Sequence, residues 1–270
     1  MPYEKVKRKS GEGMNQQERR QFLIRRLLDE QPRYRTMELP SGEAEQRRLL
    51  RSLFNLRMPG RIDEAFLTVQ DEYLREATRQ KGVTALADLT PMEPGLYLWQ
   101  GDITTLACDA IVNAANSGMT GCYQPCHNCI DNCIHTFAGV QLRNTCAEIM
   151  EQQGYEEPTG QAKLTPAFNL PCNYVIHTVG PIVQGRLTKR HEELLASCYR
   201  ACLELAEENR LRSVAFCCIS TGVFGFPQGR AAEIAVQTVR KFKTSTHSEI
   251  EVIFNAFKDE DYAIYRALLG

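Results

Sequence analysis

The sequence predicts a three-layer α/β fold, in which helices cover both faces of a mixed central sheet and an N-terminal helical extension precedes it. Two observations predict this fold. Apolar residues recur at helical spacing up to about residue 90, and short β-rich segments alternate with helical ones after Gly95. We therefore divide the 270-residue chain into an extension, residues 1–90, packed on an α/β domain, residues 91–270.

The composition excludes several classes of function. The formal net charge of −1 provides no chain-wide attraction for nucleic acids or acidic membrane surfaces, and residues 1–90 carry only eighteen basic against fourteen acidic residues. The polar start Met1–Asn15 lacks the apolar run of a secretory signal, and no segment is apolar for long enough to span a bilayer. We expect a cytoplasmic protein that binds neither nucleic acid nor membrane.

Three apolar stripes predict the helices of the extension. They consist of Phe22, Leu23, Leu27 and Leu28; Leu49, Leu50, Leu53 and Phe54; and Phe66, Leu67, Tyr73, Leu74 and Ala77. Pro40, the pair Pro59 and Gly60, and Gly82 separate these stripes as turn residues do. Such stripes usually form a core, so we expect a helical layer packed on the domain, with recognition of a partner or substrate as the alternative.

The domain is predicted to alternate strands with helices. Strands are expected over residues 96–99, 110–112, 162–168, 174–179, 213–220 and 251–257, and helices over 130–153, 188–209, 230–242 and from 259 onwards. Ligands of open α/β sheets bind beyond the carboxyl ends of the strands. The loops after Val112, Val179 and Ser220 are therefore the expected site.

A glycine-rich loop, Ser220–Phe226, follows an apolar strand and precedes a helix. Two glycines let backbone N–H groups curl around an anion, so the loop has the form of a phosphate cradle, although many such loops only turn the chain. Phe224 and Phe226 are costly to expose unless they pack on something. That partner is either a ribose or base of the ligand, or the protein core.

Two further polar loops follow predicted strands. Asp102, in Gly101–Thr104, can accept a hydrogen bond from an exocyclic amine such as that of adenine, or it can simply form a turn. In Asn113–Asn116, side-chain amides leave the sheet where they would suit the paired hydroxyls of a sugar. Each loop alone is modest support for a nucleotide ligand.

Taken in order, the runs Gly101–Thr104, Asp109–Asn116, Val175–Pro181 and Ile219–Pro227 resemble the macrodomain family over about residues 94–270. In that family the first aspartate holds adenine, the glycine loop wraps the diphosphate and the asparagine loop faces the distal ribose. The ADP-ribose-binding residues that the resemblance implies are Asp102, Ile103, Asn113, Asn116, Ile130, Asp131, Ser220, Thr221, Gly222, Val223, Phe224, Gly225 and Phe226. Phe257, at a strand end, is a candidate for the adenine side, with core packing as the alternative.

All eleven cysteines lie at Cys108 or later, and four of them cluster at Cys122, Cys126, Cys129 and Cys133. In a reducing compartment such a cluster indicates metal binding or catalysis rather than disulfides. Three thiols and the imidazole of His127 lie close enough in sequence to reach one tetrahedral Zn²⁺. We expect Cys122, His127 and Cys129 as ligands, because adjacent Cys126 and His127 would have to bend sharply to share a metal. Cys133 and His135 follow at helical spacing, and His135 is expected to be an ordinary helix residue.

The cysteine cluster stands where a MacroD-type hydrolase has a short run of glycines. In this respect the chain resembles the zinc-containing macrodomains, a bacterial branch that removes ADP-ribose from proteins. That resemblance implies a partnership with a sirtuin-like ADP-ribosyltransferase and a lipoylated carrier protein. Zinc beside the ribose-facing asparagines is expected to be catalytic, since three protein ligands leave a position for water or a substrate hydroxyl. The alternative is a closed structural zinc site that only holds the loop in place.

The catalytic residues predicted are Asn116 and Asp131. By resemblance to MacroD-type enzymes, Asp131 holds the distal ribose and orients the attacking water, whereas the alternative is an aspartate that only stabilises a helix start. The function predicted is zinc-dependent hydrolysis of mono-ADP-ribose from modified proteins, with an ester to an acidic side chain as the bond cleaved. The alternatives are a non-catalytic ADP-ribose-binding module and a phosphatase or deacylase acting on small ADP-ribose derivatives.

Overall fold

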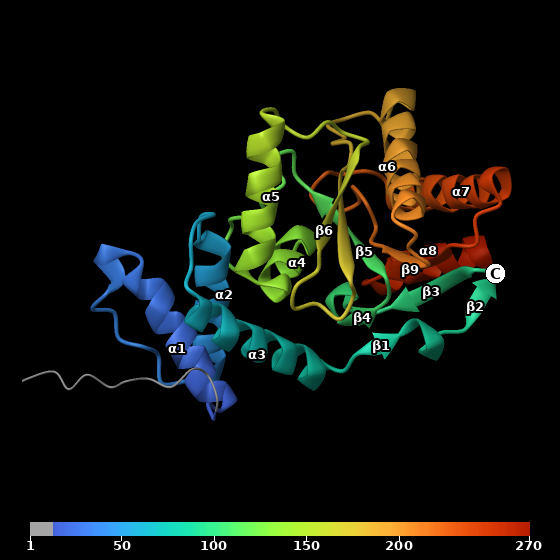
Figure 1. Ribbon diagram of the computed structural model, residues 1–270. Helices are drawn as coiled ribbons and strands as arrows, with labels where there is room; N and C mark the ends of the chain where they lie inside the picture. The colour runs from blue at the N-terminus through green and yellow to red at the C-terminus, as the bar shows by residue number, and fades with distance from the viewer. Residues whose placement is uncertain (1–12) are drawn as a thin grey trace, which may run out of the picture.

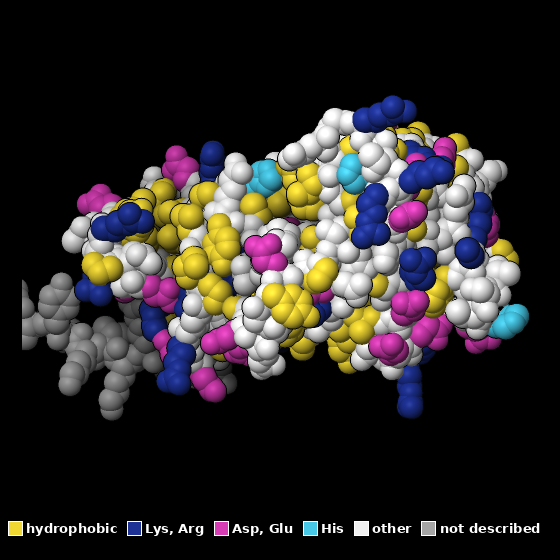
Figure 2. Space-filling model, turned by 90° about the horizontal axis from the view of Figure 1, so that it is seen from above, with side chains coloured by type: hydrophobic (Ala, Val, Ile, Leu, Met, Phe, Trp, Pro, Cys, Tyr) yellow, Lys and Arg dark blue, Asp and Glu magenta, His cyan; other side chains and the backbone are white. Residues whose placement is uncertain are grey.

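The computed structural model describes residues 13–270, so most of the polar start Met1–Asn15 lies outside the described residues. A small helical part and a larger α/β part follow one another along the chain (Figure 1). None of the helices in residues 13–270 combines the length and apolar character needed to cross a membrane. Basic and acidic side chains are mixed over the face shown in Figure 2.

A seven-stranded sheet forms the centre of the domain. Its spatial order is β2 (Pro91–Glu93), β3 (Leu96–Gln100), β9 (Glu251–Ala256), β8 (Ser213–Phe216), β5 (Ala110–Ala115), β7 (Tyr174–Val179) and β6 (Ala162–Pro166). The five central strands are parallel, whereas β2 and β6 pair antiparallel at the two edges. A separate parallel pair joins β1 (Thr84–Ala85) to β4 (Leu106–Ala107). The predicted mixed sheet is confirmed.

Helices cover both faces of the sheet, which confirms the predicted three layers (Figure 1). On one side lie α4 (Ile130–Ala138) and α5 (Val140–Gln153), and on the other α6 (Lys189–Glu208), α7 (Gln228–Thr246) and α8 (Asp259–Leu269). The strands are buried on both faces because they are almost continuously apolar. Aromatic pairs join α6 and α8 to the sheet, since Tyr199 lies 4.9 Å from Phe216 and Tyr265 lies 5.2 Å from Phe254, between ring centroids.

Several predicted elements were wrong in extent. The strand expected over 110–112 continues to Ala115, so Asn113 lies within β5 and not in the loop after it. The single helix expected over 130–153 is two helices, because Gly139 has a φ of 95° and breaks the helical path between α4 and α5. The strand expected over 213–220 ends at Phe216, and Ser220 has a φ of 66°, which extended backbone does not allow. The four residues after Phe216 therefore belong to the loop that follows β8.

The extension has an apolar core of its own. Three helices, α1 (Gln16–Asp29), α2 (Glu43–Leu56) and α3 (Glu64–Lys81), pack through the predicted stripes, and Val140 of α5 joins the same cluster. Both α2 and α3 contact α4, and α3 also contacts the turn after β3. The extension thus packs at the carboxyl ends of the parallel strands, next to the predicted site loops (Figure 1).

Candidate active site

The carboxyl ends of the five parallel strands meet at one edge of the sheet, as their register requires. The polar loops predicted from the sequence all begin there. Asp102 follows β3, Asn116 follows β5, Gly180 follows β7, and the loop Ser220–Phe226 lies between β8 and α7. The fold therefore brings together motifs that are more than a hundred residues apart in the chain.

The two predicted catalytic residues are hydrogen-bonded to each other. Asn116 Nδ2 donates to Asp131 Oδ2 at 3.1 Å, and Asn113 Nδ2 donates to Asp131 Oδ1 at 2.8 Å. Asp131 lies in the first turn of α4 and is only 5% exposed. Burial raises the pKa of its carboxyl to about 6, although the hydrogen bonds from Asn113 and Asn116 act in the opposite direction. The carboxylate is thus held from two sides by amides of the asparagine loop.

Asn113 is fully buried and supports Asp131 from within the sheet. Its second amide hydrogen points to His177 Nδ1, 3.1 Å away, and His177 Nε2 lies 2.9 Å from Thr165 Oγ1. Burial lowers the pKa of His177 to about 3, so the ring is neutral. Because the Asn113 amide donates to Nδ1, the ring proton lies on Nε2 and is donated to Thr165. Asn113 therefore belongs to a buried network that supports Asp131.

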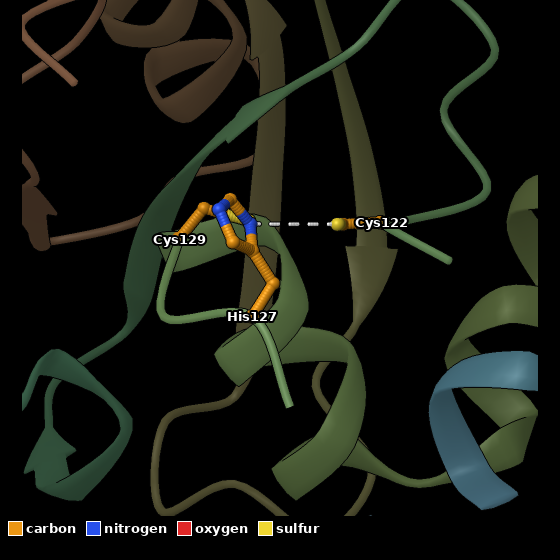
Figure 3. Close-up of side chains that lie close together, drawn as sticks. All are labelled: Cys122, His127 and Cys129. Carbon is orange, nitrogen blue, oxygen red and sulfur yellow. Dashed lines mark hydrogen bonds between the residues drawn. The ribbon is translucent and has the colours of Figure 1, made fainter. Parts of the chain in front are cut away.

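The three predicted metal ligands converge (Figure 3). The ligand atoms of Cys122, His127 and Cys129 all lie within 4.8 Å of one another, and Cys122 Sγ is 3.6 Å from His127 Nδ1. A sulfur and a nitrogen bound to the same tetrahedral Zn²⁺ are also about 3.6 Å apart. Two thiols and an imidazole are donors that suit zinc, so the residues present fit this metal.

The other two cysteines of the cluster point elsewhere. Cys126 has a φ of 53°, and its Sγ lies 3.2 Å from Ser52 Oγ and 3.4 Å from the Arg48 carbonyl oxygen, both in α2. Cys133 lies one turn into α4, with its Sγ 3.5 Å from Arg51 Nη2. Neither belongs to the group formed by the three predicted ligands.

The three predicted metal ligands and the pair Asn116 and Asp131 lie next to each other. Cys129 caps α4 through its Sγ, which accepts from Asn132 N at 3.4 Å, and Asp131 follows two residues later. Asn116 Nδ2 also donates to the Gly121 carbonyl at 3.2 Å, at the start of residues 121–129, the cysteine loop. A Cβ at Gly121 would lie 2.8 Å from the His135 ring, so glycine is required for this close approach.

Asp102 already has polar partners. Its Oδ1 accepts from Thr104 N at 3.0 Å and from Thr104 Oγ1 at 2.6 Å, and its Oδ2 accepts from Lys81 Nζ at 2.9 Å. Burial raises its pKa, but these bonds outweigh burial and hold the pKa below its usual value. Ile103 is only 1% exposed and packs in the core of the domain. Phe257 is 73% exposed, so the core-packing alternative for this residue is wrong.

The glycine-rich loop closes on itself. Phe226 N donates to the Ser220 carbonyl at 3.0 Å, and Gly225 N donates to the Gly222 carbonyl at 3.1 Å. Phe226 is 2% exposed and seals the core, whereas Phe224 is half-buried and Val223 is 75% exposed. The exposed tip of the loop, from Thr221 to Gly225, is thus the part that can meet a ligand.

Gly180 and Ser220 approach each other too closely for any other residue at position 180. A Cβ there would lie 2.1 Å from Ser220 Oγ. That hydroxyl is buried and has no hydrogen-bond partner among the residues that the structure describes. Gly180 lies in the predicted loop after Val179. Because it has no side chain, it leaves room for the Ser220 hydroxyl at the start of the glycine-rich loop.

Comparison with known proteins decides the family. The macro domain model matches residues 112–235. A protein of Treponema medium named "Protein-ADP-ribose hydrolase" is 60% identical over 261 residues, which are 95% of this chain and 100% of that protein. This chain belongs to the macrodomain family.

Further relatives agree. A Staphylococcus aureus protein, also named "Protein-ADP-ribose hydrolase", is 48% identical over 92% of this macrodomain protein and 94% of its own length. The solved Trypanosoma brucei macrodomain in complex with ADP-ribose has a TM-score of 0.63 and 31% identity, over 81% of this chain and 95% of its own. The relatives named as hydrolases confirm the predicted class of enzyme.

His177 stands in one of the macrodomain motifs of the sequence, but no role was predicted for it. An ionisable residue in the mostly apolar strand β7 is the signal that could have found it, because a buried imidazole needs partners. Arg143 was missed entirely. It is 5% exposed, and its Nε donates to the Thr120 carbonyl at 2.7 Å, just before the cysteine loop of this macrodomain.

The buried imidazole of His177 predicts that stability falls in acid. In the unfolded chain His177 binds a proton near pH 6.5, but the folded chain keeps it neutral until about pH 3. Protonation therefore favours the unfolded chain, and the stability present above pH 6.5 is lost as the pH falls. From pH 6.5 to 5 this one residue should lower the free energy of unfolding by about 2 kcal/mol.

Denaturant unfolding at several pH values measures this effect. His177→Gln should flatten the dependence, and His247→Gln, at an exposed histidine, should keep the slope of the wild type. An equal slope in His177→Gln and wild type would contradict the assignment.

Proposed function

We propose that this macrodomain protein is a zinc-dependent hydrolase that removes mono-ADP-ribose from modified proteins. The observation that carries the proposal is the hydrogen-bonded pair Asn116 and Asp131, in direct continuity with the ligand group Cys122, His127 and Cys129. The names of the full-length relatives support removal of ADP-ribose from proteins. The donor set and its spacing support zinc.

The residues of this chain would have the following roles in hydrolysis. The Asp131 carboxylate, fixed by Asn113 and Asn116, would orient the attacking water at the anomeric carbon of the distal ribose and accept a proton from it. Asn116 would also bind a ribose hydroxyl. The burial of Asp131, which is 5% exposed, would limit access of bulk water to the reacting carbon. Bound Zn²⁺ would supply Lewis-acid activation of oxygen at the position that three protein ligands leave open.

The remaining loops would hold the rest of ADP-ribose. The tip of the glycine-rich loop would bind the diphosphate through its backbone, next to the N-terminus of α7. Asp102 would accept from the adenine amine, for which Lys81 and Thr104 hold its carboxylate ionised and oriented. The exposed ring of Phe257, after β9, suits the face of the base.

Metal removal tests the catalytic proposal. The protein treated with a chelator should release free ADP-ribose from a modified protein at least 100-fold more slowly than the zinc-loaded protein, since a positioned Lewis acid is lost. Added Zn²⁺ should restore the rate. Equal rates with and without metal would falsify the catalytic role of zinc and leave only a structural role for it. A modified protein that binds but is never cleaved would indicate a binding module instead.

The bond cleaved is proposed to be the ester between ADP-ribose and an acidic side chain. One protein modified on glutamate and one modified on arginine, at equal concentration, separate the ester from the N-glycosidic linkage. We expect release from the glutamate substrate alone. Faster turnover of a phosphorylated or acetylated ADP-ribose than of either modified protein would instead indicate a hydrolase of small derivatives.

A further inference from the structure

Helix α2 of the extension lies against the loop that carries the metal ligands. We call residues 121–129 the cysteine loop. Arg51, Ser52 and Asn55 of α2 contact the cysteine loop through their side chains, and Arg48, one turn before Ser52, contacts it through its backbone carbonyl. Figure 1 shows α2 beside α4, the helix that follows this loop. The contact surface is thus an ordered row of polar groups.

Asn55 fixes the bend in the middle of the loop. Its side chain is 1% exposed, Oδ1 accepts from Cys126 N at 2.8 Å, and Nδ2 donates to Thr136 Oγ1 at 2.9 Å. Cys126 has the left-handed φ of 53°, which a residue with a side chain rarely adopts without support. This bend directs Cys126 towards α2 and sets the start of His127, the next residue.

Arg51 holds the backbone at two of the three ligands. Its Nη2 donates to the His127 carbonyl at 2.7 Å and to Asn132 Oδ1 at 3.1 Å. Asn132 Nδ2 in turn lies 3.3 Å from the Cys122 carbonyl and 3.0 Å from the Gln124 carbonyl, as their donor. One guanidinium therefore fixes His127 directly and Cys122 through a buried amide.

Arg143 ties the end of α2 to the start of the loop. Its Nη1 donates to the carbonyls of Phe54, Asn55 and Arg57, at 3.0, 2.8 and 2.7 Å, and its Nε donates to Thr120. A cation at the carboxyl end of a helix is also favoured by the helix dipole. The position of α2 is thus coupled to both ends of the cysteine loop.

From these contacts we propose that Arg51 and Asn55 are positioning residues for the metal, and that the extension is a structural part of the active site. They hold the backbone of the cysteine loop in the shape in which Cys122, His127 and Cys129 converge. The inference rests on the zinc site of the proposed function. Partners of this kind, which orient ligands without touching the metal, typically change metal affinity by about 10-fold to 100-fold when they are removed.

Zinc affinity of the full chain, measured by competition with a chromophoric chelator, tests the inference. Arg51→Met should weaken zinc binding by about 10-fold. Arg51→Lys keeps a charge but not the planar fork, so a smaller loss of about threefold is expected, and this variant decides the question if Arg51→Met does not fold. The matched control is Arg47→Met, one turn earlier on α2, where the exposed guanidinium pairs with Glu43.

The affinity for ADP-ribose at saturating zinc and the melting temperature separate positioning from general stability. Positioning predicts that the ADP-ribose affinity of the Arg51 variants stays within about twofold of the Arg47→Met value while zinc affinity falls. Zinc affinity equal to that of Arg47→Met overturns the inference. So does a loss of zinc affinity matched by an equal loss of ADP-ribose affinity and a lower melting temperature. A wild-type chain that binds no zinc overturns the zinc site and this inference together.

Discussion

Asp131→Ala is expected to lower kcat for ADP-ribose release by about 100-fold to 1,000-fold, while ADP-ribose still binds. The carboxylate is the one acidic group that Asn113 and Asn116 both hold, and its loss removes the oriented acceptor for the proton of the attacking water. Single-turnover release of ADP-ribose from a modified protein measures the chemical step. Titration calorimetry with free ADP-ribose measures binding.

A matched control separates this role from the stabilisation of a helix start. Glu64→Ala removes an exposed acidic residue from the first turn of α3, where it has the same favourable position relative to the helix dipole. It should change stability by less than about 1 kcal/mol and leave turnover unchanged. If Asp131→Ala retains full turnover, the catalytic role assigned to this residue is wrong.

Cys129→Ser should reduce the zinc content of the purified protein from about one ion per chain towards zero, and turnover by at least about 100-fold. A serine hydroxyl is a poor zinc ligand, and burial already raises the pKa of the Cys129 thiol to about 12, so a cation is needed to keep the thiolate. Elemental analysis of the protein and the release assay measure the two effects.

The same loop offers its own control. Cys126→Ser changes a thiol only three residues away, but that side chain points to Ser52 and the Arg48 carbonyl. It should keep the zinc content and turnover of the wild type. Equal zinc loss in both variants would show that the loop binds metal through a ligand set other than Cys122, His127 and Cys129.

Most of the fold could be predicted from local pattern. Helical stripes located α1, α2 and α3, and short β-rich runs located six strands of the sheet. Five of these strands are parallel, and burial on both faces makes such strands almost continuously apolar. The break at Gly139 was not predicted, because a glycine within a helical pattern is often tolerated. In the structure Gly139 has a φ of 95°, and Gln70 of α3 stabilises the break by accepting a hydrogen bond from Val140 N. Contacts across the chain, and not local propensity, decide such breaks.

The site was predictable to the extent that its residues are neighbours in sequence. The spacing within the cysteine loop predicted Cys122, His127 and Cys129, and the structure brings these together. The support of Asp131 by Asn113 and His177, and of the cysteine loop by Arg51, joins segments 18 to 76 residues apart. Such pairs depend on how elements pack in space, which periodicity along the chain does not encode.

The apolar core of the extension also bears on the order of events during synthesis. Nearly all of its members lie in α1, α2 and α3, so these helices can pack before the ribosome has added the cysteine loop. When residues 121–129 emerge, the face of α2 that carries Arg51 and Asn55 can already be in place. The N-terminal helices can then act as an intramolecular template that orders this loop, including the left-handed backbone at Cys126.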